Sequence, residues 1–195
     1  MKVVQVKCPS CNSPIYSKQR DRLFHCDNCK TMHVRDGGVR KIDYEIAEFG
    51  NAPDAGRTYV PFWRMYCNFA IRSKSVEGGY GFRLASWLKG TDDSGSLFVY
   101  VPAGDFDANT FKQLATGITM SRPKYKTRLD FSTVARMPAA MSSAEAEELA
   151  DFVVVTMEAE KPGVLQRLDY SLTVNDSRVV YLPFIATQTG LMSAL

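Results

Sequence analysis

Residues 8–29 read CPSCNSPIYSKQRDRLFHCDNC, and this stretch predicts the structure of the N-terminal part of the chain. It contains two Cys-x-x-Cys motifs, Cys8 to Cys11 and Cys26 to Cys29, with 14 residues between them. Two residues between cysteines let one tight turn present both sulfurs to the same ion, and two such turns complete a tetrahedron. The spacing therefore predicts one metal site built from Cys8, Cys11, Cys26 and Cys29.

The metal expected at this site is zinc. Zn²⁺ favours tetrahedral thiolate sites, and four protein sulfurs leave no open position for a substrate, so we expect a single structural ion. Iron suits the same four-sulfur geometry and stays the alternative, and a third reading leaves the four thiols without metal. Where thiols stay reduced, paired Cys-x-x-Cys motifs indicate metal ligands rather than disulfides.

The two motifs, Cys8-Pro9-Ser10-Cys11 and Cys26-Asp27-Asn28-Cys29, resemble the knuckles of the zinc-ribbon family over residues 6–35. The family often carries glycine directly after the second cysteine of each knuckle, where a positive φ is common. Asn12 and Lys30 stand at these positions here. Asn tolerates a positive φ and Lys adopts it less readily, so the departure affects the ideal turn geometry and not the choice of ligands.

The bulk composition is that of an ordinary globular protein. The chain has 195 residues, of which 45% are hydrophobic and 23% charged. No apolar run approaches the roughly 18 residues that span a bilayer, and the start does not read as a signal peptide, so we expect a cytoplasmic protein. The expected organisation is a zinc ribbon over 1–42, a turn-rich linker over 43–58 and an α/β domain over 59–195.

Alternating apolar residues and turn signals predict the strands of the main domain. A long strand is followed by one hairpin, and a last hairpin turns at Asn175-Asp176-Ser177. The predicted strands occupy residues 59–72, 80–88, 96–101, 165–174 and 178–187.

Two helices are predicted between the hairpins. Asp107 is the expected N-cap of a helix from about residue 108. Ser142 and Glu145 match a capping box that opens a second, acidic helix. The predicted fold class is α+β: an N-terminal zinc ribbon, then a mostly antiparallel sheet with two helices on one face, in the order βββ-α-α-ββ.

Short internal similarities suggest a duplication within residues 59–195. The segment Tyr59-Val60-Pro61-Phe62 resembles Tyr181-Leu182-Pro183-Phe184. Two weakly similar halves, each a hairpin plus a helix, would explain this match. Chance explains it as well, because the matched segments are only four residues long.

Basic residues gather in two segments. Residues 1–41 contain nine lysines and arginines against three acidic residues, and the segment 122–128 places a tyrosine among four cations. Such a pattern can grip phosphates or stack a base, and zinc ribbons in transcription and translation machinery often use a basic surface, as the resemblance implies. A solvated or packed loop is the structural alternative. The residues that we consider for contact with nucleic acid or a protein partner are Lys18, Arg20, Arg22, Arg35, Arg122, Lys124, Tyr125, Lys126 and Arg128.

The sequence contains no recognisable catalytic motif. Both histidines, His25 and His33, lie in the ribbon, where we expect packing or surface roles rather than metal ligation. Cys67 shares the apolar face of the long predicted strand, which favours a core thiol over a nucleophile.

These observations favour a non-catalytic, zinc-binding adaptor that interacts with a protein partner in a larger intracellular assembly. Nucleic-acid binding through the basic ribbon and the 122–128 segment is the alternative, and an enzyme of unrecognised type is the third reading. The sequence does not indicate the oligomeric state.

Overall fold

The computed structural model of the chain describes residues 6–15, 21–77, 89–91, 94–160 and 164–195. It is a mixed α+β structure in which two helices accompany mostly antiparallel sheets, as the sequence predicts. Three sheets are present among these residues: a two-stranded and a three-stranded sheet near the N-terminus, and one eight-stranded sheet.

The described N-terminal residues up to Ile42, which we call the ribbon, form two small sheets. Strand β1 (Val6–Lys7) pairs with β2 (Pro14–Ile15) around the first Cys-x-x-Cys turn. Strand β3 (Leu23–Cys26) enters the second turn and pairs with β4 (Thr31–Arg35), which leaves it. Strand β5 (Val39–Ile42) adds to β4, so both cysteine turns are held by short antiparallel pairs.

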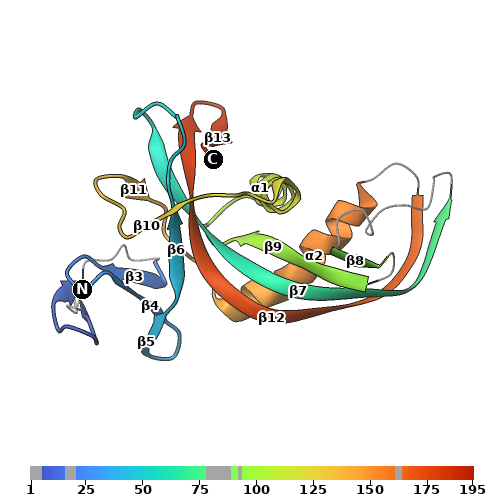
Figure 1. Cartoon of the computed structure of the whole chain (residues 1–195), viewed down its shortest axis with the longest axis horizontal. Helices are drawn as coiled ribbons and strands as arrows, with labels where there is room; N and C mark the ends of the chain where they lie inside the picture. The colour runs from blue at the N-terminus through green and yellow to red at the C-terminus, as the bar shows by residue number, and fades with distance from the viewer. Residues whose placement is uncertain (1–5, 16–20, 78–88, 92–93, 161–163) are drawn as a thin grey trace.

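Two very long strands organise the large sheet. Strands β7 (Arg57–Glu77) and β12 (Val164–Thr187) pair antiparallel over nearly their whole lengths and run across the molecule as a curved double ribbon (Figure 1). The order of the main path is β10-β6-β12-β7-β9-β8. The other strands of this sheet are β6 (Tyr44–Ala47), β8 (Lys89–Thr91), β9 (Ser94–Pro102), β10 (Thr127–Arg128), β11 (Ala135–Arg136) and β13 (Gly190–Ser193).

The expected last hairpin over 165–174 and 178–187 is wrong, because both segments belong to the single strand β12. Asn175-Asp176-Ser177 makes no reversal there. The register against β7 shifts between Val174 and Asp176, so this site is a bulge. Despite the turn propensity of this segment, the strand continues through it, because the residues on both sides pair with β7. One extra residue is left in β12 as a bulge. The actual final hairpin joins β12 to β13.

Two further expectations about the strands differ from what the structure describes. The segment 43–58, expected as a linker, contains β6, which lies parallel to β12 with Tyr44 opposite Val179. Residues 80–88 of the first predicted hairpin lie outside the described residues, and the short strand β8 pairs with β9 instead through Thr91 and Ser94.

The helices begin where their capping residues predict. Helix α1 (Ala108–Ser121) starts at Asp107, whose carboxylate accepts hydrogen bonds from the backbone N–H groups of Asn109 and Thr110, both at 3.0 Å. Helix α2 (Ser143–Ala159) starts at Ser142, and a complete capping box links Ser142 to Glu145. Such caps satisfy N–H groups that have no partner within the helix.

The expectation that both helices cover one face of the sheet holds only for α2. Helix α2 packs Ala146, Ala150 and Val153 in the same core cluster as Trp63 and Met65 of β7. Helix α1 instead lies at the edge of β9 beyond the end of β8. There the Thr119 hydroxyl accepts a hydrogen bond from the backbone N–H of Tyr100 at 3.0 Å. An edge strand needs such cover because its outward backbone groups otherwise lack partners.

Because of this edge position, α1 contributes to both core clusters. Its Leu114 and Ile118 pack in the second cluster with Phe62 on the other face of β7, whereas Ala115 and the partly buried Phe111 pack in the first.

The ribbon and the large sheet share one core. Leu23, Met32 and Val34 of the ribbon belong to the same buried cluster as Tyr59 and Trp63 of the main sheet. In Figure 1 the blue ribbon strands lie directly against β6 and the loop that carries β10 and β11. The ribbon is therefore packed into the body of the protein rather than attached to it by a chain segment alone.

The two similar tetrapeptides lie opposite each other across the β7–β12 pair. Tyr59 faces Pro183, Val60 faces Leu182 and Pro61 faces Tyr181, so a local two-fold axis relates the segments. Their surroundings match as well. The Pro61 carbonyl accepts from the N–H of Ala103 at 2.8 Å, and the Pro183 carbonyl accepts from the N–H of Ala194 at 3.0 Å. The duplication itself stays a prediction.

Candidate metal centre and the surfaces around it

The four predicted ligands lie together. Their sulfur atoms are all within 4.8 Å of one another, with 3.5 Å between Cys11 and Cys26 and 3.6 Å between Cys8 and Cys29. A tetrahedral zinc site with Zn–S bonds of about 2.3 Å needs sulfurs about 3.8 Å apart. The site therefore fits one tetrahedrally coordinated ion, and the four cysteines could hold a metal such as zinc.

Both cysteine turns have the same backbone geometry. The N–H of Asn12 donates to the carbonyl of Cys8, and the N–H of Lys30 donates to the carbonyl of Cys26, each at 2.8 Å. Asn12 (φ 62°) and Lys30 (φ 53°) are both left-handed, although neither is glycine. The carbonyl of Lys30 accepts from the Tyr44 hydroxyl at 2.7 Å, which helps to hold this less favourable conformation.

Hydrogen bonds around the sulfurs favour thiolates at part of the site. Bonds from the hydroxyl and the backbone N–H of Ser13 lower the pKa of Cys11 to about 5. The Thr31 hydroxyl lies 2.9 Å from the sulfur of Cys29. Burial dominates at Cys26 and raises the pKa of its thiol to about 12. A positive ion is the natural counterpart for such a buried sulfur, because it replaces the proton and stabilises the thiolate.

Both histidines are buried beside the cysteine turns. His25 lies 3.1 Å from the Asp27 carboxylate through Nδ1, and its ring packs edge-on against Tyr44 and Phe131. His33 is fully buried, with Nε2 3.3 Å from the Ser10 hydroxyl and 4.0 Å from the sulfur of Cys8. Burial lowers the pKa of both imidazoles, so both are neutral at pH 7.

A buried ion pair fastens the ribbon to the body. Asp21 of the ribbon lies 2.7 Å from Arg136 of β11, and their side chains are only 2% and 18% exposed. The same carboxylate accepts from the N–H of Ala139 at 3.0 Å, and the carbonyl of Ala139 accepts from the N–H of Arg22 at 2.7 Å. Each of these contacts joins residues more than a hundred positions apart, which explains why no local signal in the sequence predicts them.

The residues proposed for partner contact are distributed over different surfaces. Arg22 pairs with Glu145 at 3.6 Å and Arg35 lies over the Phe24 ring, so these ribbon cations already contact their surroundings. Arg128 bonds to Ser132 beside the ribbon. Lys126 is exposed. Lys18 and Arg20 lie outside the described residues.

Tyr125 belongs to a polar cluster that sequence reasoning did not find. Glu45 of β6 accepts two bonds from Arg64 at 2.8 and 2.9 Å, one from Tyr125 at 2.9 Å and one from Arg178 at 3.0 Å. Burial raises the pKa of Glu45, but its hydrogen bonds to Arg64, Tyr125 and Arg178 outweigh this, so the carboxyl titrates below its usual range. Arg64 and Arg178 are far apart in the sequence, and only the register of β7 and β12 places them opposite each other beside Glu45.

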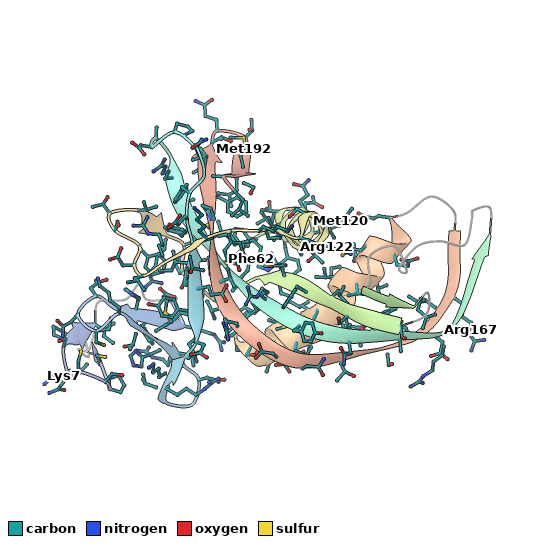
Figure 2. All side chains as sticks on the ribbon, in the orientation of Figure 1. Lys7, Phe62, Met120, Arg122, Arg167 and Met192 are labelled. Atoms are coloured by element: carbon teal, nitrogen blue, oxygen red, sulfur yellow. The ribbon has the colours of Figure 1, made fainter. Side chains whose placement is uncertain are left out.

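Arg122 and Lys124 line a groove of about 510 Å³ on the main sheet. We call it the aromatic groove. It lies beside β9, between the sheet face and the segment that follows α1, and Figure 2 places Arg122 at the end of α1, far from Lys7 of the ribbon. Its lining is Tyr66, Ser96, Leu97, Phe98, Tyr100, Thr119, Arg122, Pro123, Lys124 and Met157.

Cys67 has the surroundings of a core residue. Its side chain is fully buried in the cluster that includes Trp63 and Met65, and burial raises the pKa of the thiol to about 12. A thiol in this state is a poor nucleophile, because only the thiolate reacts.

Known proteins supply no further assignment for this site. Within the described parts of the chain, no helix combines the length and apolar character needed to cross a membrane.

Comparisons with protein-family models, with curated proteins and with solved structures found no match to the chain.

Proposed function

We propose that this chain is a non-catalytic adaptor, in which one structural Zn²⁺ bound by the four cysteines holds the ribbon on the main sheet. The proposal is supported by the position of the four-sulfur site, which lies in a ribbon that shares its buried core with the main sheet. Four sulfurs satisfy zinc completely. The strands next to the four cysteines bury Leu23, Met32 and Val34 against the main sheet, so the role of the ion is structural.

Metal analysis tests the structural part of this proposal. We expect one zinc per chain by elemental analysis, and loss of that zinc in Cys26→Ser, with Cys67→Ala as a control that removes a thiol outside the site. Iron in place of zinc, visible by its absorption, would overturn the zinc assignment. A wild-type protein that folds without metal would overturn the structural role.

The adaptor role is tested by the partner. Tagged wild-type protein is expected to co-purify from its native cell within a larger assembly, and Cys26→Ser is expected to lose that partner because its ribbon is no longer held. A wild-type protein that purifies alone under gentle conditions would count against an adaptor.

A second candidate, nucleic-acid binding, is favoured by one observation. Two of the predicted basic contact residues, Arg122 and Lys124, line the aromatic groove together with exposed aromatic rings.

A further inference from the structure

The floor of the aromatic groove is an exposed pair of aromatic rings. Tyr66 of β7 and Phe98 of β9 are directly opposite each other in the register, and their ring centroids are 5.2 Å apart. The residues remain 36% and 48% exposed, although both are large and apolar. Tyr66 and Phe98, whose ring planes are tilted by 48° to each other, therefore both present aromatic surface to the groove.

The wall of the groove is positively charged. Arg122 and Lys124 are exposed and lie on either side of Pro123, in the segment that follows α1. Among the described lining residues there are two cations and no acidic side chain. A third cation, Arg64, lies 5.3 Å from the Phe98 centroid, but its charge is partly balanced by Glu45. The groove thus combines a stacking surface with an anion-attracting wall.

The shape of the groove selects among anionic ligands. A volume of about 510 Å³ falls in the range of sites that take a small molecule or a few units of a polymer. The rings at the bottom are reachable by an unstacked base but not by the stacked bases of a duplex, whose faces are covered. Stacking surfaces beside a cationic track are the usual basis for binding single strands without strong sequence preference.

We propose that the aromatic groove binds single-stranded nucleic acid, with bases on Tyr66 and Phe98 and backbone phosphates against Lys124 and Arg122. This inference rests on the second candidate function, nucleic-acid binding, and specifies the class of nucleic acid and its site. An acidic peptide would satisfy the cations but gains little from two flat rings, whereas a nucleotide supplies a π-face and a phosphate in each unit.

The test measures binding of labelled oligothymidylate and oligouridylate to the zinc-loaded full-length protein, by fluorescence anisotropy over a salt series. A duplex and a polyglutamate peptide serve as competing ligand classes. Phe98→Leu keeps an apolar side chain but removes the stacking ring, and Lys124→Gln removes one charge. The matched controls are Phe152→Leu, an exposed aromatic of α2 outside the groove, and Lys41→Gln, an exposed cation of β5. Zinc content and thermal melting confirm that each variant is folded.

We expect salt-sensitive binding of single strands, weaker binding of the duplex and none of polyglutamate. Phe98→Leu should weaken single-strand binding roughly fivefold to a hundredfold, which is the range for one stacked base. Lys124→Gln should reduce the slope of log K against log salt by about 0.7. Lys124 is the better probe because Arg122 also caps the C-terminal end of α1.

Three results would overturn the inference. Absence of single-strand binding at low salt refutes it outright. Binding that both groove variants leave unchanged, but that Arg35→Gln abolishes, places the contact on the ribbon. Binding of polyglutamate in preference to nucleic acid assigns the groove to a protein partner and leaves the adaptor proposal standing. A wild-type protein that is isolated folded and without zinc, by contrast, contradicts the proposed function and not the ligand of the groove.

Discussion

Removing the metal is expected to destabilise the main sheet as well as the ribbon. When the four cysteines lose their ion, the short strands of the ribbon lose what positions them, because pairs of this length have little stability of their own. Leu23, Met32 and Val34 are at most 2% exposed and share a core with Tyr59 and Trp63. Undocking the ribbon therefore exposes apolar surface on the main sheet too.

The size of the effect follows from these three side chains. Burying one such side chain stabilises a protein by about 1.5–3 kcal/mol, so three contribute about 4.5–9 kcal/mol. The whole stability of a domain is about 5–15 kcal/mol. The ion pair between Asp21 and Arg136 adds little to this figure, since both groups regain water when the ribbon leaves. For a chain of this length the loss corresponds to a fall in Tm of at least about 10 °C.

The assay follows Trp63, whose indole N–H donates to the carbonyl of Met141 at 3.1 Å inside the shared core. The chain has two tryptophans, so a Trp87→Phe background leaves Trp63 as the only reporter. Urea unfolding is compared between zinc-loaded protein, chelator-treated protein and Cys26→Ser. Adding zinc back to the chelator-treated protein should restore the urea midpoint of the zinc-loaded protein. Chelator should not lower the midpoint of Cys26→Ser further. A Trp63 midpoint that is the same with and without metal would refute the shared-core reasoning.

Three further predictions concern single side chains. Asp21→Ala, in zinc-loaded protein, leaves Arg136 buried without its partner and should cost about 3–5 kcal/mol in urea unfolding. An unchanged free energy of unfolding would contradict the role of this ion pair. The folded-state pKa of Glu45 lies below its unfolded value, so its stabilisation is present at neutral pH and is lost as pH falls through the folded pKa. The urea midpoint of Glu45→Gln should accordingly vary less than that of the wild type from pH 6 downward, and parallel curves would contradict the role of this cluster. Lys30→Gly removes the strain of a left-handed lysine and should stabilise the zinc-loaded protein by about 1 kcal/mol in urea unfolding, whereas Asn12→Gly should change the free energy of unfolding less. A destabilised Lys30→Gly would show that the pairing of Lys30 with Asp130 matters more than backbone strain.

The features that the sequence predicts well are those whose causes are local. The Cys-x-x-Cys turns need only two residues between ligands, and the caps at Asp107 and Ser142 act on residues two or three positions away. The strand β6 was missed because a four-residue parallel strand has almost no signal of its own. The bulge near Asp176 was read as a turn because turn propensity is local, whereas the partner strand that overrides it lies about a hundred residues away. The aromatic groove was not predicted because Tyr66 and Phe98 meet only through the register of β7 and β9.

The period of two along β7 explains why the metal and the groove can be tested separately. Tyr59, Trp63 and Met65 point to the face that carries α2 and the ribbon contacts. The intervening positions Arg64 and Tyr66 point to the opposite face, where the Glu45 cluster and the aromatic groove lie. Changes at Phe98 or Lys124, which lie outside the shared core cluster, should therefore leave the zinc-supported core in place, whereas loss of zinc weakens the strand that carries both faces. A zinc-free protein should lose ligand binding at the groove, but a groove variant that loses its ligand should keep its zinc.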